Sequence, residues 1–78
     1  MSVRVRYFAA AADAAGTDAE DRTEPSLTAL RAGLVADHPA LGGILDRCAL
    51  LVDGTRRDDD APLAGAAYVD VLPPFAGG

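Results

Sequence analysis

The sequence has no tryptophan and no lysine, and it has a single cysteine, Cys48, and a single histidine, His38. One cysteine cannot form an internal disulfide, and a small domain without disulfides is typical of a reducing compartment. Zinc sites made of four cysteines, or of two cysteines and two histidines, are excluded by these counts. No apolar run approaches the roughly 18 residues that a membrane-spanning helix needs. We therefore expect a cytoplasmic protein with no membrane segment and no bound metal.

The chain has 78 residues, with seven arginines against twelve acidic residues and a formal net charge of −5. This length corresponds to one domain, residues 1–78, which buries only about 60% of the surface that the unfolded chain exposes. A nucleic-acid partner requires a basic surface that replaces phosphate counterions, so the acidic balance argues against one. The same charge is compatible with a basic protein partner, whose encounter rate it would raise.

Residues 3–8 alternate in the manner of a strand with two different faces. One face carries Val3, Val5 and Tyr7, and the other carries Arg4, Arg6 and Phe8. Two arginines cannot face a small core unpaired, so the valine face is expected to point inward. Phe8 is then left on the outer face beside two charges.

Further elements follow from local patterns. Residues 9–15 form a short helical connection that Gly16 ends, and residues 17–24 are a weak edge strand or a loop. Residues 26–36 are the main helix, with Ser26 as its N-terminal cap, and Pro39 ends it before one more helical turn at residues 41–45. Residues 49–52 are predicted to be a buried strand, followed by a turn at Asp53-Gly54 and a charged surface at residues 56–60. Residues 67–72 form the last strand, with Val69 and Val71 inward and Tyr68, Asp70 and Leu72 outward.

This order of elements predicts an α+β domain in which a small mixed sheet packs on one main helix. A single helix can cover only one face of the sheet, so the other face is left for solvent or for a partner. Catalytic and metal-binding patterns are absent. Asp58-Asp59-Asp60 lacks the glycine and final glutamate of a calcium loop, His38 is expected to cap the main helix, and Cys48 is expected in the core.

The end of the chain is the most informative segment. The tail consists of Pro73, Pro74, Phe75, Ala76, Gly77 and Gly78. The two prolines end the strand because neither donates a ladder hydrogen bond, and the two glycines leave the terminal carboxylate without neighbouring side chains. Four residues from Phe75 span at most about 13–14 Å, which is enough to thread this carboxylate into the active site of another protein.

Together these segments resemble the MoaD/ThiS family of sulfur carriers, which are ubiquitin-like β-grasp proteins. The resemblance covers essentially the whole chain. It is carried by Val-Arg-Val-Arg-Tyr-Phe-Ala at residues 3–9, the leucine-rich helix, Leu-Leu-Val-Asp-Gly at residues 50–54, and Asp-Val-Leu-Pro-Pro-Phe-Ala-Gly-Gly at residues 70–78. The Pro-Pro-x-x-Gly-Gly ending is most similar to the small subunit of molybdopterin synthase, since the thiamine-pathway carrier generally lacks the proline pair.

The resemblance implies a function in which the chain is a non-catalytic sulfur donor. A ubiquitin-activating-like, MoeB-like adenylyltransferase would use ATP to adenylate the Gly78 carboxylate, and a sulfur donor would convert the adenylate to a thiocarboxylate. The chain itself would bind no cofactor. The tail would then enter a MoaE-like large subunit and deliver sulfur to cyclic pyranopterin monophosphate. In the family the positions of Phe8 and Leu72 meet both partners, and we expect Arg4, Arg6 and Tyr68 to share this surface.

Two alternatives remain open at this point. The carrier could serve another pathway, such as cysteine, thiolated tRNA or a secondary metabolite, or less plausibly thiamine. The chain could instead be a ubiquitin-like protein modifier that is conjugated to target lysines. The lack of lysine in the chain argues against polymeric ubiquitin-like chains.

Overall fold

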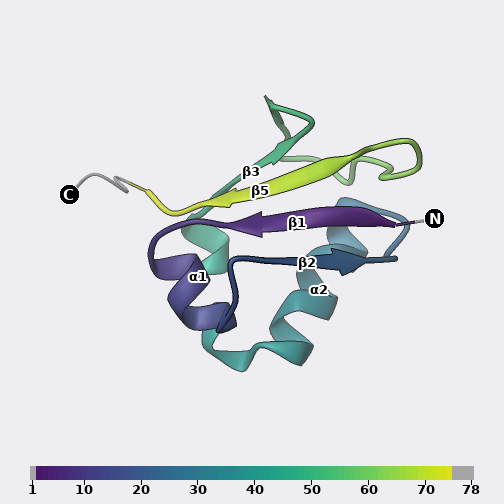
Figure 1. The fold of residues 1–78 in the computed structure, drawn as a ribbon. Helices are drawn as coiled ribbons and strands as arrows, with labels where there is room; N and C mark the ends of the chain where they lie inside the picture. Colours follow the sequence, from purple (N-terminus) through teal and green to yellow (C-terminus); the bar gives the residue numbers. More distant parts are fainter. Residues whose placement is uncertain (1, 75–78) are drawn as a thin grey trace.

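The structure, a computed structural model, describes residues 2–74 as a mixed sheet with helices packed against one side (Figure 1). The strands are β1 (Val3–Tyr7), β2 (Ala19–Arg22), β3 (Ala49–Val52), β4 (Thr55–Arg56) and β5 (Tyr68–Leu72). The helices are α1 (Ala10–Ala15) and α2 (Leu27–Asp37), followed by short 3-10 helices at Pro39–Gly43 and Leu45–Arg47. None of the helices within residues 2–74 has the length and apolarity needed to traverse a lipid bilayer. The α+β class predicted from the sequence is confirmed.

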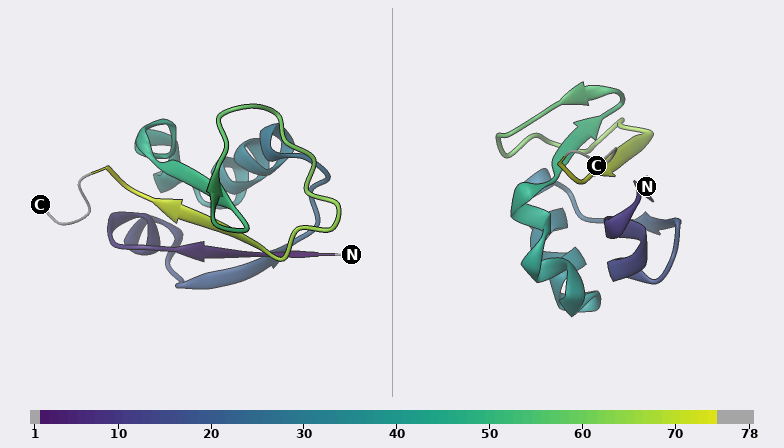
Figure 2. Two further views of the ribbon diagram at one scale, coloured as in Figure 1. Left: turned by 90° about the horizontal axis from the view of Figure 1, so that it is seen from above. Right: turned by 90° about the vertical axis from the view of Figure 1, so that its left-hand side faces the viewer.

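The strand order β2-β1-β5-β3-β4 places β1 and β5 at the centre of the sheet. These two strands are parallel, with Arg6 opposite Asp70 and Tyr7 opposite Val71. Parallel strands end at the same edge of a sheet, so β5 reaches Pro73 at the edge where β1 leads into α1 (Figure 2). The tail therefore begins beside the end of β1.

Hydrogen bonds from neighbouring residues cap both ends of helix α2. The Ser26 hydroxyl accepts a hydrogen bond from the amide of Ala29 at 3.3 Å, as an N-terminal cap should. A second cap comes from a distant loop, where the Asp60 carboxylate accepts from the amide of Thr28 at 3.0 Å. At the other end the amide of His38 donates to Leu34, and Pro39 begins the next helical segment. The predicted helix is confirmed with its end at Asp37.

The core lies between α2 and one face of the sheet. Its largest fully buried side chains are Leu27, Leu30, Leu34, Leu41, Leu50, Val5, Val69 and Val71. All of the helices lie on this side, and the opposite face of the sheet carries none over the described residues (Figure 2). The predicted inward face of β1 is therefore confirmed.

The loop before β5 is held by a turn that the sequence predicts. Asp53 and Gly54 have φ values of 49° and 86°, the positive values that a tight two-residue hairpin turn requires. The Asp53 carboxylate also accepts hydrogen bonds from the amides of Ala67 and Tyr68, at 3.0 and 2.9 Å. The turn thus fixes the start of β5 as well as the β3–β4 connection.

The strand predicted at residues 49–52 is confirmed as β3, but its predicted burial holds only in part. The segment 49–52 was predicted to be a buried strand, but only Leu50 is fully buried. Ala49, Leu51 and Val52 are half-buried. The reason is that Ala49 and Leu51 point to the face that lacks helices, since they lie opposite Leu72 and Asp70 of β5.

Candidate functional site

The residues predicted from the sequence to contact a partner protein lie together on the face of the sheet that carries no helices. We call it the outer face, defined by Arg4, Arg6, Phe8, Tyr68, Asp70 and Leu72. The parallel register places Arg4 opposite Tyr68 and Arg6 opposite Asp70, which brings the two outward sets together. Phe8 follows β1 directly and its amide donates to Val71 at 3.2 Å, so it lies at the edge from which the tail leaves.

A charged pair organises the centre of the outer face. The Arg6 guanidinium donates through Nε to Asp70 Oδ1 at 2.5 Å and through a terminal nitrogen to Oδ2 at 2.9 Å. The same guanidinium lies 4.0 Å from the ring centroid of Tyr68. Asp70 is only 9% exposed, and its hydrogen bonds from Arg6 raise the pKa of that guanidinium. A bidentate pair of this kind fixes the arginine and with it the aromatic ring.

The apolar part of the outer face lies towards the tail. Phe8 is 40% exposed and Leu72 is half-buried at this end, whereas Tyr68, also 40% exposed, lies at the start of β5, at the far end of the strand from the tail. The strand register also brings Leu51 and Arg56 next to this face. Leu51 lies between Asp70 and Arg56, and the Arg56 guanidinium contacts Asp58 at 3.5 Å. The sequence did not indicate Leu51, which stands in a segment predicted to be buried, and its pairing with Asp70 is what places it here.

The tail begins at this edge. Pro73 is half-buried and Pro74 is exposed directly after β5. The predicted tail residues from Phe75 to Gly78, including the Gly78 carboxylate, lie outside the described residues. What the structure shows is the exit point, which the apolar residues of the outer face flank.

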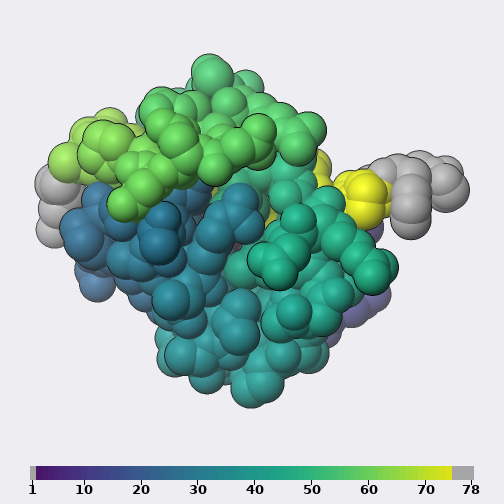
Figure 3. Space-filling view, turned by 180° about the vertical axis from the view of Figure 1, so that it is seen from behind, coloured from purple at the N-terminus to yellow at the C-terminus, as the bar shows by residue number. Residues whose placement is uncertain are grey.

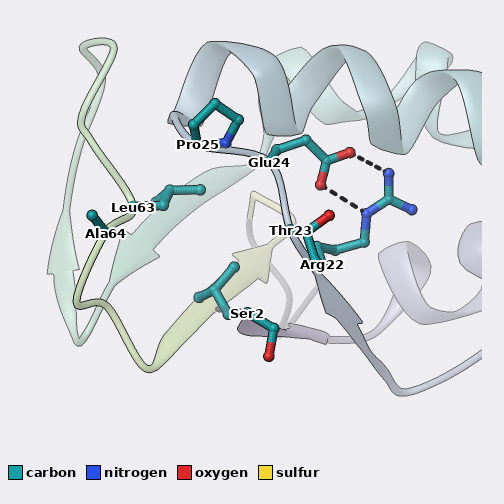
Figure 4. A pocket seen from close by; sticks show the side chains of 8 residues that line it. Ser2, Arg22, Thr23, Glu24, Pro25, Leu63 and Ala64 are labelled. Atoms are coloured by element: carbon teal, nitrogen blue, oxygen red, sulfur yellow. Dashed lines mark hydrogen bonds and ion pairs between the residues drawn. The ribbon is translucent and has the colours of Figure 1, made fainter.

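A cavity of about 140 Å³ lies at the opposite end of the sheet, beside the start of β1 (Figure 4). Ser2, Thr23 and Leu63 line it together with Arg22 and Glu24. The Arg22 guanidinium and the Glu24 carboxylate bond each other there, at 3.0 Å through Nε. The Glu24 carboxylate balances the positive charge of the Arg22 guanidinium, so this cavity does not offer an anion-binding site.

The same arginine is the centre of a polar network against α2. We call it the Arg22 cluster, formed by Tyr7, Glu20, Arg22, Glu24, Asp37 and His38. Arg22 makes ion pairs with Glu20, Glu24 and Asp37. Glu20 also accepts from the Tyr7 hydroxyl at 2.6 Å and contacts His38 Nε2 at 2.5 Å. This cluster fixes edge strand β2 to the helix.

The cluster shifts the titration of its acids. Hydrogen bonds from Arg22 lower the pKa of Glu24 below its ordinary value of 4.5, against the opposing effect of burial. Burial would raise the pKa of Glu20, but the hydrogen bonds from Tyr7, His38 and Arg22 outweigh it, and the pKa is lowered. Burial and the bond to Glu20 raise the pKa of Tyr7.

We expect Glu24→Gln to lower the free energy of unfolding at neutral pH and to flatten its decline in acid. A carboxylate with a depressed folded-state pKa contributes stability above its unfolded pKa and loses it as the pH falls through the folded value. The stability of the unmodified chain should therefore decline below pH 4.5, and the two curves should converge. Urea unfolding of both chains at a series of pH values measures their free energies of unfolding. If these free energies declined equally steeply with falling pH in the two chains, the prediction would be contradicted.

The remaining candidates from the sequence have structural roles. Cys48 is buried at 6% exposure, its thiol donates to the carbonyl of Ile44, and burial raises its pKa. His38 follows α2 as its C-terminal cap, as predicted, but its contact with Glu20 was not foreseen. Asp58, Asp59 and Asp60 are all exposed, and the Asp60 carboxylate also caps α2.

Comparisons with known proteins agree with this architecture. The chain is similar to SAMP1 from Haloferax volcanii, with 22% identity, 100% coverage of both chains and a TM-score of 0.83. It is also similar to a chain in the complex of subunits 1 and 2 of molybdopterin-converting factor from Helicobacter pylori 26695. That chain is 28% identical, with 100% of both chains covered and a TM-score of 0.74. A search of curated protein sequences finds no match.

These likenesses confirm the predicted ubiquitin-like β-grasp fold, a five-stranded mixed sheet on a helix. The model of the ThiS family matches residues 5–78, which is nearly the whole chain. The chain therefore belongs to the ThiS family of ubiquitin-like sulfur carriers.

Proposed function

We propose that this protein is the sulfur-donating small subunit of molybdopterin synthase. The observation that carries the proposal is the Pro-Pro-Phe-Ala-Gly-Gly sequence directly after β5, at the edge of the open outer face. Support comes from the 28% identity over the full length to a chain of the molybdopterin-converting factor complex. In this role the chain has no catalytic site of its own and needs no bound cofactor.

The chemistry takes place at the Gly78 carboxylate. A MoeB-like activating enzyme transfers the AMP moiety of ATP to this carboxylate and releases pyrophosphate. A donor then supplies sulfur at the oxidation level of sulfide, which attacks the acyl carbon; the C–O bond to AMP breaks, AMP leaves, and a thiocarboxylate remains on Gly78. The large subunit transfers the sulfur to cyclic pyranopterin monophosphate, with a carboxylate regenerated on the carrier by water.

The residues of this chain contribute binding and protection. An acyl-adenylate acylates amines, and a chain without lysine has no side-chain amine near its reactive end. Phe8 and Leu72 offer apolar contact around the tail exit, and Tyr68 adds an exposed ring at the start of β5. An exposed apolar patch with a charged rim is typical of a protein contact. Arg4 and Arg6 form part of that rim, since they pair with Asp21 and Asp70.

A reconstituted synthase tests the proposal. The chain with a Gly78 thiocarboxylate is combined with a molybdopterin synthase large subunit and the cyclic pyranopterin precursor, and molybdopterin is measured. We expect product from the thiocarboxylate form and none from the carboxylate form. No product, with a large subunit that is active with its own partner, would reject this pathway in favour of a carrier for another acceptor.

A matched pair of variants tests the outer face in the same assay. Phe8→Ala should raise the carrier concentration needed for half-maximal rate at least about tenfold, because central aromatic residues carry much of the energy of an interface. Val35→Ala is the control, since Val35 is similarly exposed at 36% but lies on α2, on the other side of the sheet. Equal effects of the two variants would contradict the assignment of the outer face.

A further inference from the structure

Ala9, which joins β1 to α1, has an unusual backbone conformation. Its φ is 51° and its ψ is −126°. The amide of Ala11 donates to the carbonyl of Phe8 at 3.0 Å, which closes residues 8–11 into a turn. The two angles are close to the values of about +60° and −120° that define the first central residue of a type II′ turn. Glycine is the usual residue there, because it has no Cβ that a positive φ brings against the backbone.

A comparison with Asp53 shows what Ala9 lacks. Within residues 2–74, Asp53 is the other non-glycine residue with a positive φ. Its carboxylate accepts hydrogen bonds from the amides of Ala67 and Tyr68, so the fold gains from an aspartate at that turn. Aspartate also adopts positive φ angles more readily than alanine does. Ala9 has only a methyl group, which cannot make a hydrogen bond that offsets its backbone strain.

The methyl group of Ala9 adds nothing to the core that the structure describes. The alanines that follow it in α1 do contribute, since Ala11 is fully buried and Ala12, Ala14 and Ala15 pack against the core while partly buried. Ala9 is exposed. A glycine would therefore suit the free protein better. A residue that breaks a local rule with no gain in the fold indicates a functional position.

Ala9 lies at the edge of the sheet from which the tail leaves. Its neighbour Phe8 is fixed on both sides, since the Phe8 amide donates to Val71 at 3.2 Å and the Phe8 carbonyl accepts from Ala11. In Figure 3, which shows the molecule from behind, the end of β5 in yellow emerges at this end, above the purple of α1. The exposed methyl group of Ala9 therefore directly follows Phe8 at the exit of the tail.

We propose that the methyl group of Ala9 contacts the large subunit and helps to determine which partner the carrier binds. The inference rests on the proposed function and adds Ala9 to the surface that Phe8 and Leu72 offer. In the complex the methyl group is buried in a small apolar recess of the large subunit, which supplies the gain that the free fold lacks. The closed turn holds the methyl group in place before binding, so little conformational freedom is lost on association.

Unfolding experiments measure the strain. Ala9→Gly should raise the midpoint of urea unfolding, because glycine adopts this turn without strain and the relief outweighs the greater freedom of glycine in the unfolded chain. Ala36→Gly is the matched control, since Ala36 is also exposed but lies within α2, where glycine is a poor helix former. It should lower the midpoint. A lower midpoint for Ala9→Gly would show that Ala9 is not strained and would overturn the inference.

Binding is measured in the reconstituted synthase with the thiocarboxylate form of each chain. Ala9→Gly should raise the carrier concentration needed for half-maximal rate about fourfold, which is the effect of one buried methyl group, and leave the maximal rate unchanged. Ala36→Gly should change neither quantity. Glycine favours the same turn, so hydrogen exchange of the Ala11 amide should be no faster in Ala9→Gly than in the unmodified chain. A purely structural residue would not combine a more stable fold with weaker binding.

The contrary outcomes are separable. If the unmodified chain and Ala9→Gly reach half-maximal rate at the same concentration, the methyl group makes no contact, and the inference is overturned while the proposed function stands. Faster exchange of the Ala11 amide in Ala9→Gly would assign the weaker binding to a loosened turn and would also overturn it. If the unmodified thiocarboxylate yields no molybdopterin with an active large subunit, the proposed function fails and the inference fails with it.

Discussion

Deletion of Gly78 is expected to abolish formation of the C-terminal thiocarboxylate while leaving the fold intact. Removal of one residue withdraws the carboxylate by about 3.3–3.6 Å from the position in the activating enzyme where it attacks the α-phosphate of ATP. Reacting atoms must approach to about 3–3.5 Å, so the shortened chain cannot reach a productive geometry. Intact-mass spectrometry after incubation with ATP, the activating enzyme and a sulfur donor measures the product.

Stability is the control for this deletion. Gly78 lies beyond the last strand, and its loss should change the free energy of unfolding by less than about 0.5 kcal/mol. Urea unfolding of the two chains checks this. A truncated chain that still acquired a thiocarboxylate would contradict the assignment of Gly78 as the reactive residue.

Leu30→Ala, in contrast to the deletion of Gly78, is expected to cause a large loss in the free energy of unfolding. Leu30 is fully buried on the face of α2 that packs against the sheet. Truncation of a buried leucine removes its transfer free energy and leaves a cavity, at a cost of about 2–5 kcal/mol. Small domains have total stabilities near the lower end of about 5–15 kcal/mol, so part of the population should be unfolded. Urea titration followed by circular dichroism measures the loss.

Val35→Ala provides the matched control on the same helix. Val35 is 36% exposed, and its truncation should cost less than about 0.5 kcal/mol. If the two variants were equally stable, Leu30 would not be the core residue that the structure indicates.

Much of the fold was predictable because each element has a local cause. Alternation in residues 3–8 predicted both the strand and its inward valine face. Ser26 and Pro39 marked the limits of α2 within one or two residues. Asp53-Gly54 predicted the turn because few other dipeptides accept two positive φ angles.

Segments whose environment is set by distant residues were predicted less well. Leu51 looked like a core residue because it stands in an apolar run, yet its pairing with Asp70 turns it to the outer face. Asp60 looked like part of a solvated acidic turn, yet it caps a helix that begins 33 residues earlier in the chain, at Leu27. No local pattern contains such contacts.

The sequence by itself determined the class of the fold, the limits of the main helix and the composition of the tail, because these depend on neighbours within a few residues. Only the tertiary structure decided which side chains share a surface. The parallel pairing of β1 with β5 brings Arg6 to Asp70 across 64 positions and places Phe8 beside the exit of the tail. Packing likewise brings Ile44 close to Pro74, two residues that the chain keeps far apart.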